Sequence, residues 1–344
     1  MCMFVSSIVS RAAGAEPDKG KNDKLDIDGR LFVRDSLTRA DTGGTWFNEL
    51  AVSSARVQAR YRPADGVRTQ IELEFADKRA ELKDVFMRYQ RGSVRVQVGR
   101  FKRPISVMAL ESAWRLPVVE RGVVTEKLDN AAGVSVPTPF AGRSEGISAR
   151  YRTELNKTRL TITAAAMNSK LPGDFDRTNL FRDGYLRAEV RPVKWLELAA
   201  GGGYVARTNQ VGGAIDQVFV SSADVFVKRK WLRAWAELFY GRSPFFVFPR
   251  SVAVGHVKAA RLLVAPRLYR SKRALRWLDV FAQVDAIDLS SRLDNDWAWE
   301  AGGGISARLE HRWRLQVQAL RREAAAGFVL DPAYVAYVQL GSVF

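Results

Sequence analysis

The chain has 344 residues, 47% of them hydrophobic, and its mean hydropathy is −0.17. No apolar run approaches the roughly 20 residues that a membrane-spanning helix needs, which excludes a helical membrane protein. The formal net charge of +17 favours anionic partners, and the single cysteine excludes a disulfide scaffold and a cysteine-built zinc site. A soluble globular protein and a transmembrane barrel both remain, because a barrel's apolar residues alternate with polar ones.

The first residues are typical of an export signal without its positive start. Residues 3–9 (MFVSSIV) form a short apolar stretch, and residues 13–15 (AGA) fit the small-x-small cleavage pattern. We therefore expect a truncated signal peptide over 1–15, a linker over 16–26 and a single transmembrane barrel over 27–344. The alternative for the start is an unstructured leader.

Apolar and polar residues alternate along most of the remaining chain. In residues 67–75 the alternation puts Val67, Ile71 and Leu73 on one face and charged or amide side chains on the other. Successive side chains of a strand point to opposite faces, so this pattern predicts a strand with one apolar and one polar side. The alternating segments are 27–38, 46–61, 66–77, 82–91, 93–100, 143–153, 157–169, 181–192, 195–207, 214–229, 231–243, 253–270, 274–289, 296–310, 313–323 and 332–344.

These sixteen segments predict an all-β fold, a closed transmembrane antiparallel β-barrel of 16 strands. A seventeenth candidate, 130–138, is discarded because Pro137 cannot donate to a ladder and because bacterial single-chain barrels have even strand numbers. Tight turns alternate with longer polar loops, which predicts short turns and both chain ends on the periplasmic side. The expected location is therefore the bacterial outer membrane.

One connection, residues 101–142 after the fifth strand, is far longer than the others. Long loops inside compact domains are usually functional. The stretch between Val107 and Trp114 is the only one that favours a helical turn. We expect this segment to fold inward as a constriction loop that narrows the lumen.

Several segments resemble the phosphate-selective porin O and P family. Residues 84–89 (DVFMRY) and 96–104 (VQVGRFKRP) are similar to the hairpin that leads into the constriction loop of that family. Glu120-Arg121 and residues 129–134 (DNAAGV) are similar to its later parts, and the alternating last strand that ends in Phe344 agrees. The resemblance implies a 16-stranded barrel, a homotrimer, and passage of phosphate-like anions. Arg100 departs from the family, which often has glutamine there.

Arginines on the polar faces of the predicted strands are the first candidate pathway. Guanidinium groups are permanently charged and bind oxyanions through planar, paired donors. In a narrow pore with low-dielectric walls their field concentrates anions. The candidates are Arg88, Arg95, Arg150, Arg152, Arg159 and Arg187, with Arg68 and Arg191 on the same faces. The alternative is a generic polar lining neutralised by Glu72, Glu74 and Glu189.

Cations on the predicted loop are the second candidate. Lys102, Arg103, Arg115, Arg121 and Lys127 outnumber the three glutamates Glu111, Glu120 and Glu126, which predicts a net positive constriction. The alternative is that some of these cations pair with carboxylates of the wall and only hold the loop in place.

Other chemistries have little support in the residues. His256 and His311 are the only histidines, and no triad or metal-ligand spacing surrounds them, so we expect no enzyme, no cofactor and no metal. The glycine triplets 201–203 and 302–304 lack the Gly-Lys-Ser/Thr of a phosphate-binding loop, so strand bending or close packing of the inward loop explains them better. Tryptophans gather near strand ends, as interfacial girdles do, rather than in a nucleic-acid groove.

The sequence thus predicts an outer-membrane porin, a passive diffusion channel selective for anions such as phosphate or related oxyanions. Its expected partners are small anions, outer-membrane lipid and further copies of itself, with no nucleic acid. The alternatives are a non-specific porin or one for other solutes and, more remotely, a barrel enzyme or a nucleic-acid-binding protein.

Overall fold

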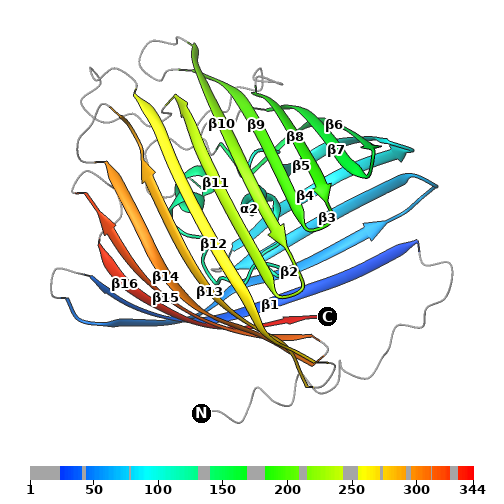
Figure 1. Cartoon of the computed structure of the whole chain (residues 1–344). Coiled ribbons are helices and arrows are strands. Elements are labelled where there is room, and N and C mark those ends of the chain that lie inside the picture. The colour runs from blue at the N-terminus through cyan, green and yellow to red at the C-terminus, as the bar shows by residue number, and fades with distance from the viewer. Residues whose placement is uncertain are drawn as a thin grey trace.

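The computed structural model describes residues 24–40, 44–76, 79–130, 140–168, 183–208, 215–242, 255–271, 274–291, 296–310, 312–325 and 332–344. Over these ranges the chain forms sixteen antiparallel strands that close into one barrel (Figure 1). Each strand pairs with its neighbours in sequence, and β1 pairs with β16 to complete the ring. No helix in the described part is long and apolar enough to cross a membrane.

All sixteen predicted strands are confirmed, with ends that shift by a few residues. They are β1 (Leu25–Ala40), β2 (Phe47–Tyr61), β3 (Val67–Ala76), β4 (Arg79–Arg91), β5 (Val94–Lys102), β6 (Arg143–Leu155), β7 (Thr158–Met167), β8 (Asp183–Val193), β9 (Leu196–Thr208), β10 (Ile215–Lys228), β11 (Leu232–Arg242), β12 (His256–Arg270), β13 (Leu275–Asp288), β14 (Trp297–Leu309), β15 (Trp313–Ala324) and β16 (Ala333–Val343). Because β1 begins at Leu25, the last two residues of the expected linker belong to the barrel. The expected signal peptide, 1–15, and nearly all of the discarded strand, 130–138, lie outside the described residues.

The outer surface of the barrel is apolar, as the alternation requires. Large hydrophobic side chains such as Ile71, Met87 and Leu238 are exposed on it, while their chain neighbours face inward. In a bilayer every backbone polar group must find a partner within the protein, and a closed ring of strands meets that demand without leaving an edge. Exposed tryptophans lie at strand ends, as predicted: Trp195 and Trp231 in turns, and Trp297 and Trp313 as first residues of strands.

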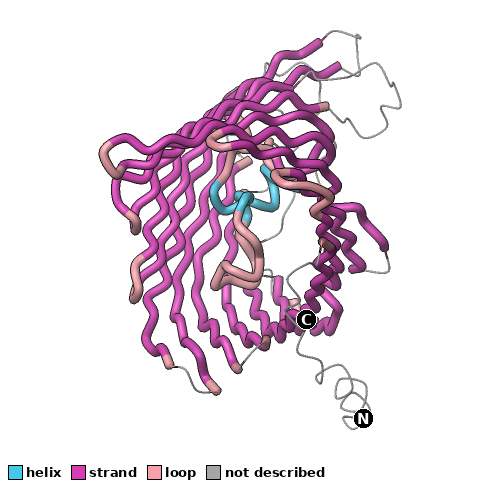
Figure 2. Tube along the Cα trace, turned by 90° about the vertical axis from the view of Figure 1, so that its right-hand side faces the viewer, coloured by secondary structure: helices cyan, strands magenta, loops and turns pink. Residues whose placement is uncertain are grey.

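The long connection between β5 and β6 lies inside the barrel (Figure 2). It contains α2 (Val107–Leu110), the short turn α3 (Val123–Thr125) and one π-helical turn, η1 (Glu126–Asn130). Ser106 caps α2, since its Oγ accepts a hydrogen bond from the Ala109 N–H at 2.9 Å. The helical turn expected after Val107 is therefore confirmed, whereas α3 and η1 were not predicted.

The hydrophobic core lies between this loop and the wall. One cluster joins Ile105, Val123 and Leu128 of the loop to wall residues that include Tyr185 and Phe239. A second cluster packs Met108, Leu116 and Val118 of the loop against Trp235, Leu263 and Phe281 of the wall. The barrel is thus partly filled by its own loop, which fixes where a solute can pass.

The glycine triplets make room for this packing. Gly203 faces Tyr185 across the β8–β9 pair, and Gly304 faces Phe281 across the β13–β14 pair. A Cβ on Gly304 would meet the Val317 carbonyl oxygen and would lie 2.8 Å from the Phe281 ring, which itself packs against the loop. Close packing of Tyr185 and Phe281 toward the inward loop therefore accounts for Gly203 and Gly304.

We predict that Gly304→Ala destabilises the folded barrel by about 1–3 kcal/mol, the usual cost of overpacking, because the backbone oxygen of Val317 cannot move aside. Gly184→Ala is the matched control, since a Cβ there meets nothing within 4 Å. Urea unfolding in detergent measures both. Equal midpoints for the two variants would contradict this account of the triplets.

Candidate functional site: the pore and its loop

The main cavity of the barrel has a volume of about 1500 Å³ and opens along the inward loop. The first strands, the loop and the last strands all contribute side chains to it. Ten of the lining residues are cationic and eight are carboxylic acids, so the cavity is strongly charged but has only a small positive excess.

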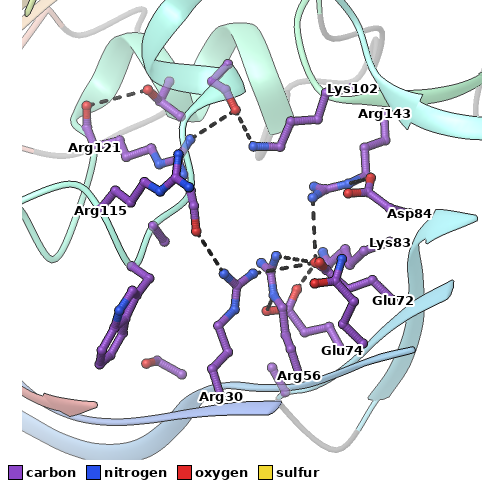
Figure 3. A pocket seen from close by; sticks show the side chains of 18 of the residues that line it. Arg30, Arg56, Glu72, Glu74, Lys83, Asp84, Lys102, Arg115, Arg121 and Arg143 are labelled. Atoms are coloured by element: carbon purple, nitrogen blue, oxygen red, sulfur yellow. Dashed lines mark hydrogen bonds and ion pairs between the residues drawn. The ribbon is translucent and has the colours of Figure 1, made fainter. Parts of the chain in front are cut away.

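Most charges on the β1–β4 side of the cavity form ion pairs. Arg56 binds Glu72 at 2.8 Å and Glu74 at 2.6 Å, and Lys83 binds Glu74 at 2.8 Å. Arg30 reaches Glu72 at 3.5 Å, and these groups converge in Figure 3. The neutralised lining considered for Glu72 and Glu74 is therefore present on this part of the wall.

Side chains of β15 hold the middle of the loop. Arg314 donates to the carbonyl oxygens of Ala113, Trp114 and Leu116. Gln318 accepts from the N–H groups of Val119 at 2.7 Å and Glu120 at 2.8 Å. Backbone groups enclosed in a protein need partners, and a loop with almost no regular structure takes them from the wall.

Wall strands on the opposite side hold the helical part. Glu237 of β11 accepts from Ser106 Oγ at 2.8 Å and from the Met108 N–H at 2.9 Å. Arg187 and Ser222 donate to the carbonyl oxygen of Ile105 at 3.0 and 2.6 Å. The loop is thus fixed from two sides and is a built part of the pore.

Two of the predicted loop cations do not face the pore. Arg103 is 2% exposed and forms a buried ion pair with Asp183 at 3.2 Å, next to the ring of Tyr185. Lys127 is 1% exposed, and burial lowers the pKa of its ammonium group. Placing both at the constriction was wrong, because each packs between the loop and the wall.

The other three loop cations line the main cavity. Lys102 donates to the carbonyl oxygens of Ala109 and Glu111. Arg121 donates to those of Met108 at 2.7 Å and Glu111 at 2.9 Å. Arg115 differs: its side chain is 75% exposed, and its ion pair with Glu111 is 3.4 Å long. Arg115 is therefore the loop cation most available to a solute.

The wall arginines of β3–β8 form directly opposed pairs. The strand register places Arg68 opposite Arg88, Arg95 opposite Arg150, and Arg159 opposite Arg191. Like charges that face each other directly across strands destabilise a sheet. Three such pairs on neighbouring hairpins concentrate positive charge on one section of the wall.

Carboxylates neutralise only part of this section, where Arg191 forms an ion pair with Glu197. Within the described residues Arg68, Arg88, Arg95 and Arg152 form no ion pair, and the first three donate to the side-chain amide oxygens of Gln70, Gln97 and Gln90. Arg150 binds Glu189 at 3.0 Å and Arg159 binds Glu154 at 3.2 Å. Near the β4–β5 turn a cavity of about 270 Å³ is lined by Arg95, Arg150 and Arg152, with Glu154 as its only carboxylic acid.

Arg187 is the exception among the wall candidates. It is 1% exposed and binds Asp224, Glu189 at 3.2 Å and the loop carbonyl of Ile105. Its assignment to the solute pathway was wrong, because all these contacts hold the loop against β8 and β10. Arg187 is a positioning residue.

Sequence reasoning missed several residues of the lining. Arg30, Arg56, Lys83, Arg143, Arg312 and Arg322 all line the main cavity. Arg30 and Arg56 lie on the polar faces of predicted strands, so the alternation used for Arg68 could have found them. Lys83 and Arg143 lie at the beginnings of the predicted segments 82–91 and 143–153, where the alternation is too short to assign a face. Among the described residues no group of three or more histidine, cysteine or acidic side chains is arranged to hold a metal ion.

We predict that Arg103→Met lowers the free energy of unfolding by about 3–5 kcal/mol, since it breaks the buried ion pair with Asp183. Arg115→Met, an exposed loop position, serves as the control and should leave stability unchanged. Denaturant unfolding of both variants in detergent checks this. A stable Arg103→Met barrel would show that the ion pair does not fasten the loop.

No protein-family model matches the chain, and no curated protein matches it. Solved structures do match it. The anion-selective porin from Comamonas acidovorans aligns with a TM-score of 0.64 at 12% identity, over 93% of this chain and 99% of that one. The outer-membrane channel DcaP of Acinetobacter baumannii aligns with a TM-score of 0.63 at 10% identity, over 93% of this chain and 97% of that one. OprB of Pseudomonas putida aligns with a TM-score of 0.64 at 10% identity, over 93% of this chain and 94% of that one.

At these identities the likeness establishes the fold. The neighbours are outer-membrane porins that match nearly the whole chain, and the exterior of this barrel is apolar. The chain therefore has the 16-stranded porin fold of the bacterial outer membrane.

Proposed function

We propose that the chain is a passive anion channel, a porin whose wall arginines form the anion path. The observation that carries this proposal is the set of opposed arginine pairs on β3–β8. Such pairs oppose folding, and a requirement for anion passage explains their presence in a water-filled lumen. One of the solved neighbours is an anion-selective porin, which supports the same reading.

The loop makes a second, smaller contribution to the proposed anion selectivity. The main cavity is nearly balanced in charge, and most of its wall cations are paired. Arg115 is the exposed cation on the loop that borders this cavity. We therefore assign the main selectivity to the wall arginines and a local adjustment to Arg115.

The finer parts of the proposal concern the solute, the assembly and the absence of catalysis. Phosphate and related oxyanions are the solutes that the family resemblance implies, and guanidinium groups suit their geometry. Assembly as a homotrimer is likewise implied by that resemblance. We also propose that the chain is not an enzyme, which the porins among its solved neighbours support.

We predict that reversal potentials in a KCl gradient favour chloride, and more strongly in dilute salt. Charges in the lumen are screened over roughly 10 Å at 0.1 M and about 3 Å at 1 M. The double variant Arg95→Gln, Arg150→Gln should lower the chloride-to-potassium permeability ratio several-fold at low salt. Arg229→Gln, an exposed arginine in the β10–β11 turn, is the control. A cation-selective wild-type pore would refute the proposed function.

We predict a smaller effect for Arg115→Glu, which should reduce anion selectivity without unfolding the barrel. Two unit charges about 4 Å apart interact by roughly 4 kcal/mol at an effective dielectric of 20, and a quarter of that changes occupancy about fivefold. The measurement is the low-salt reversal potential, with heat resistance on gels as the check on folding. Unchanged selectivity would mean that the loop does not take part in filtering.

A further inference from the structure

The side of the main cavity formed by the loop is partly apolar. Leu110, Ala113, Trp114 and Val119 of the loop line it, and each is partly exposed. Across from them, β2–β4 and β6 present ion-paired charges (Figure 3). A solute in this cavity therefore meets charge on one side and hydrocarbon on the other.

Trp114 is held in a fixed position at this surface. Arg314 binds the carbonyl oxygens on both sides of the residue and its own, which fixes the turn. The Trp114 ring lies 5.7 Å from that of Phe32, and a Cβ on Gly341 would lie 3.2 Å from it. The missing side chain at Gly341 thus lets the indole rest against β16, while another part of the indole borders the cavity.

The cavity that this indole borders is also lined by cations. Arg115 follows it directly in the chain and is largely exposed. Arg30 donates to Ser112 Oγ at 3.1 Å and lines the same cavity, as does Arg312. Figure 3 shows Arg30 and Arg115 extending into this space. An apolar platform with cations at its edge is complementary to a molecule with an apolar body and a negative end.

We propose that the pore takes organic anions with a flat apolar body, such as carboxylates that carry a ring. The ring would lie on Trp114, and the carboxylate would face Arg115 and Arg30. Inorganic oxyanions gain nothing from an apolar surface, whereas an organic anion removes that surface from water. Contact over part of one indole keeps the binding weak enough for the solute to leave, as conduction requires. This inference rests on the proposed anion channel and names its solute class.

Block of the chloride current in planar bilayers tests the proposal, with sodium benzoate and sodium gluconate as probes. Gluconate is a polar anion of larger size and controls for steric block. We expect benzoate to block the wild-type pore at a concentration at least about fivefold lower than gluconate. In Trp114→Ala that advantage should disappear, while the chloride-to-potassium permeability ratio stays unchanged. Trp231→Ala, at an exposed turn on the barrel exterior, should behave as wild type.

Trp114→Leu is the second variant, because leucine keeps apolar packing against Phe32 and should fold even if the alanine variant does not. It should also lose most of the preference for benzoate. Equal block by the two anions in the wild type, or a preference that survives in both Trp114 variants, would overturn the inference. If the wild-type pore is anion-selective, neither of these results refutes the proposed function. A pore that prefers potassium would refute both.

Discussion

The shape of the pore depends on hydrogen bonds from wall side chains to the backbone of the inward loop. The loop has only short helical turns, so most of its N–H and carbonyl groups have no regular partner. Enclosed backbone groups that stay unpaired are costly. Arg314, Gln318 and Glu237 supply those partners, and each contacts two or more loop groups. The loop therefore behaves as part of the wall, and its position sets the outline of the cavity.

This constraint divides the inward-facing polar residues into two groups. Those on β10–β15, including Asp224 and Gln316, are mostly buried against the loop and hold it or balance charge. Those on β3–β8 toward the β4–β5 turn meet no loop and are left to the solvent of the lumen. Arg103 of the loop and Arg187 of β8 are also buried between the loop and the wall, although their charge alone suggested the second group. The proposed anion path thus lies where the loop leaves the wall uncovered.

The strands could be predicted from the sequence because their cause is local. One face of each strand meets the apolar exterior and the other meets water, so a period of two is visible in segments such as 67–75. The inward loop followed from its length and from the proline that broke the weakest strand. Arginine-rich faces also followed from alternation, which explains why Arg88, Arg95 and Arg150 were found.

Burial of single charges could not be predicted, because it depends on residues far along the chain. Arg103 is buried by Asp183, which lies 80 residues away, and Glu237 reaches Ser106 across 131 residues. No local pattern carries that information. The Arg314–Gln316–Gln318 alternation was visible in the sequence, but its role as a loop anchor required the position of the loop. The apolar platform at Trp114 was hidden for the same reason.

Anomalous diffraction from crystals grown in bromide tests the central claim most directly, because it locates anions inside the pore without reference to transport. The account predicts bromide sites in the lumen beside the opposed pairs Arg95–Arg150 and Arg68–Arg88, with weaker occupancy near Arg115. Bromide confined to the outer rim, or a lumen without anion sites beside these arginines, would contradict it.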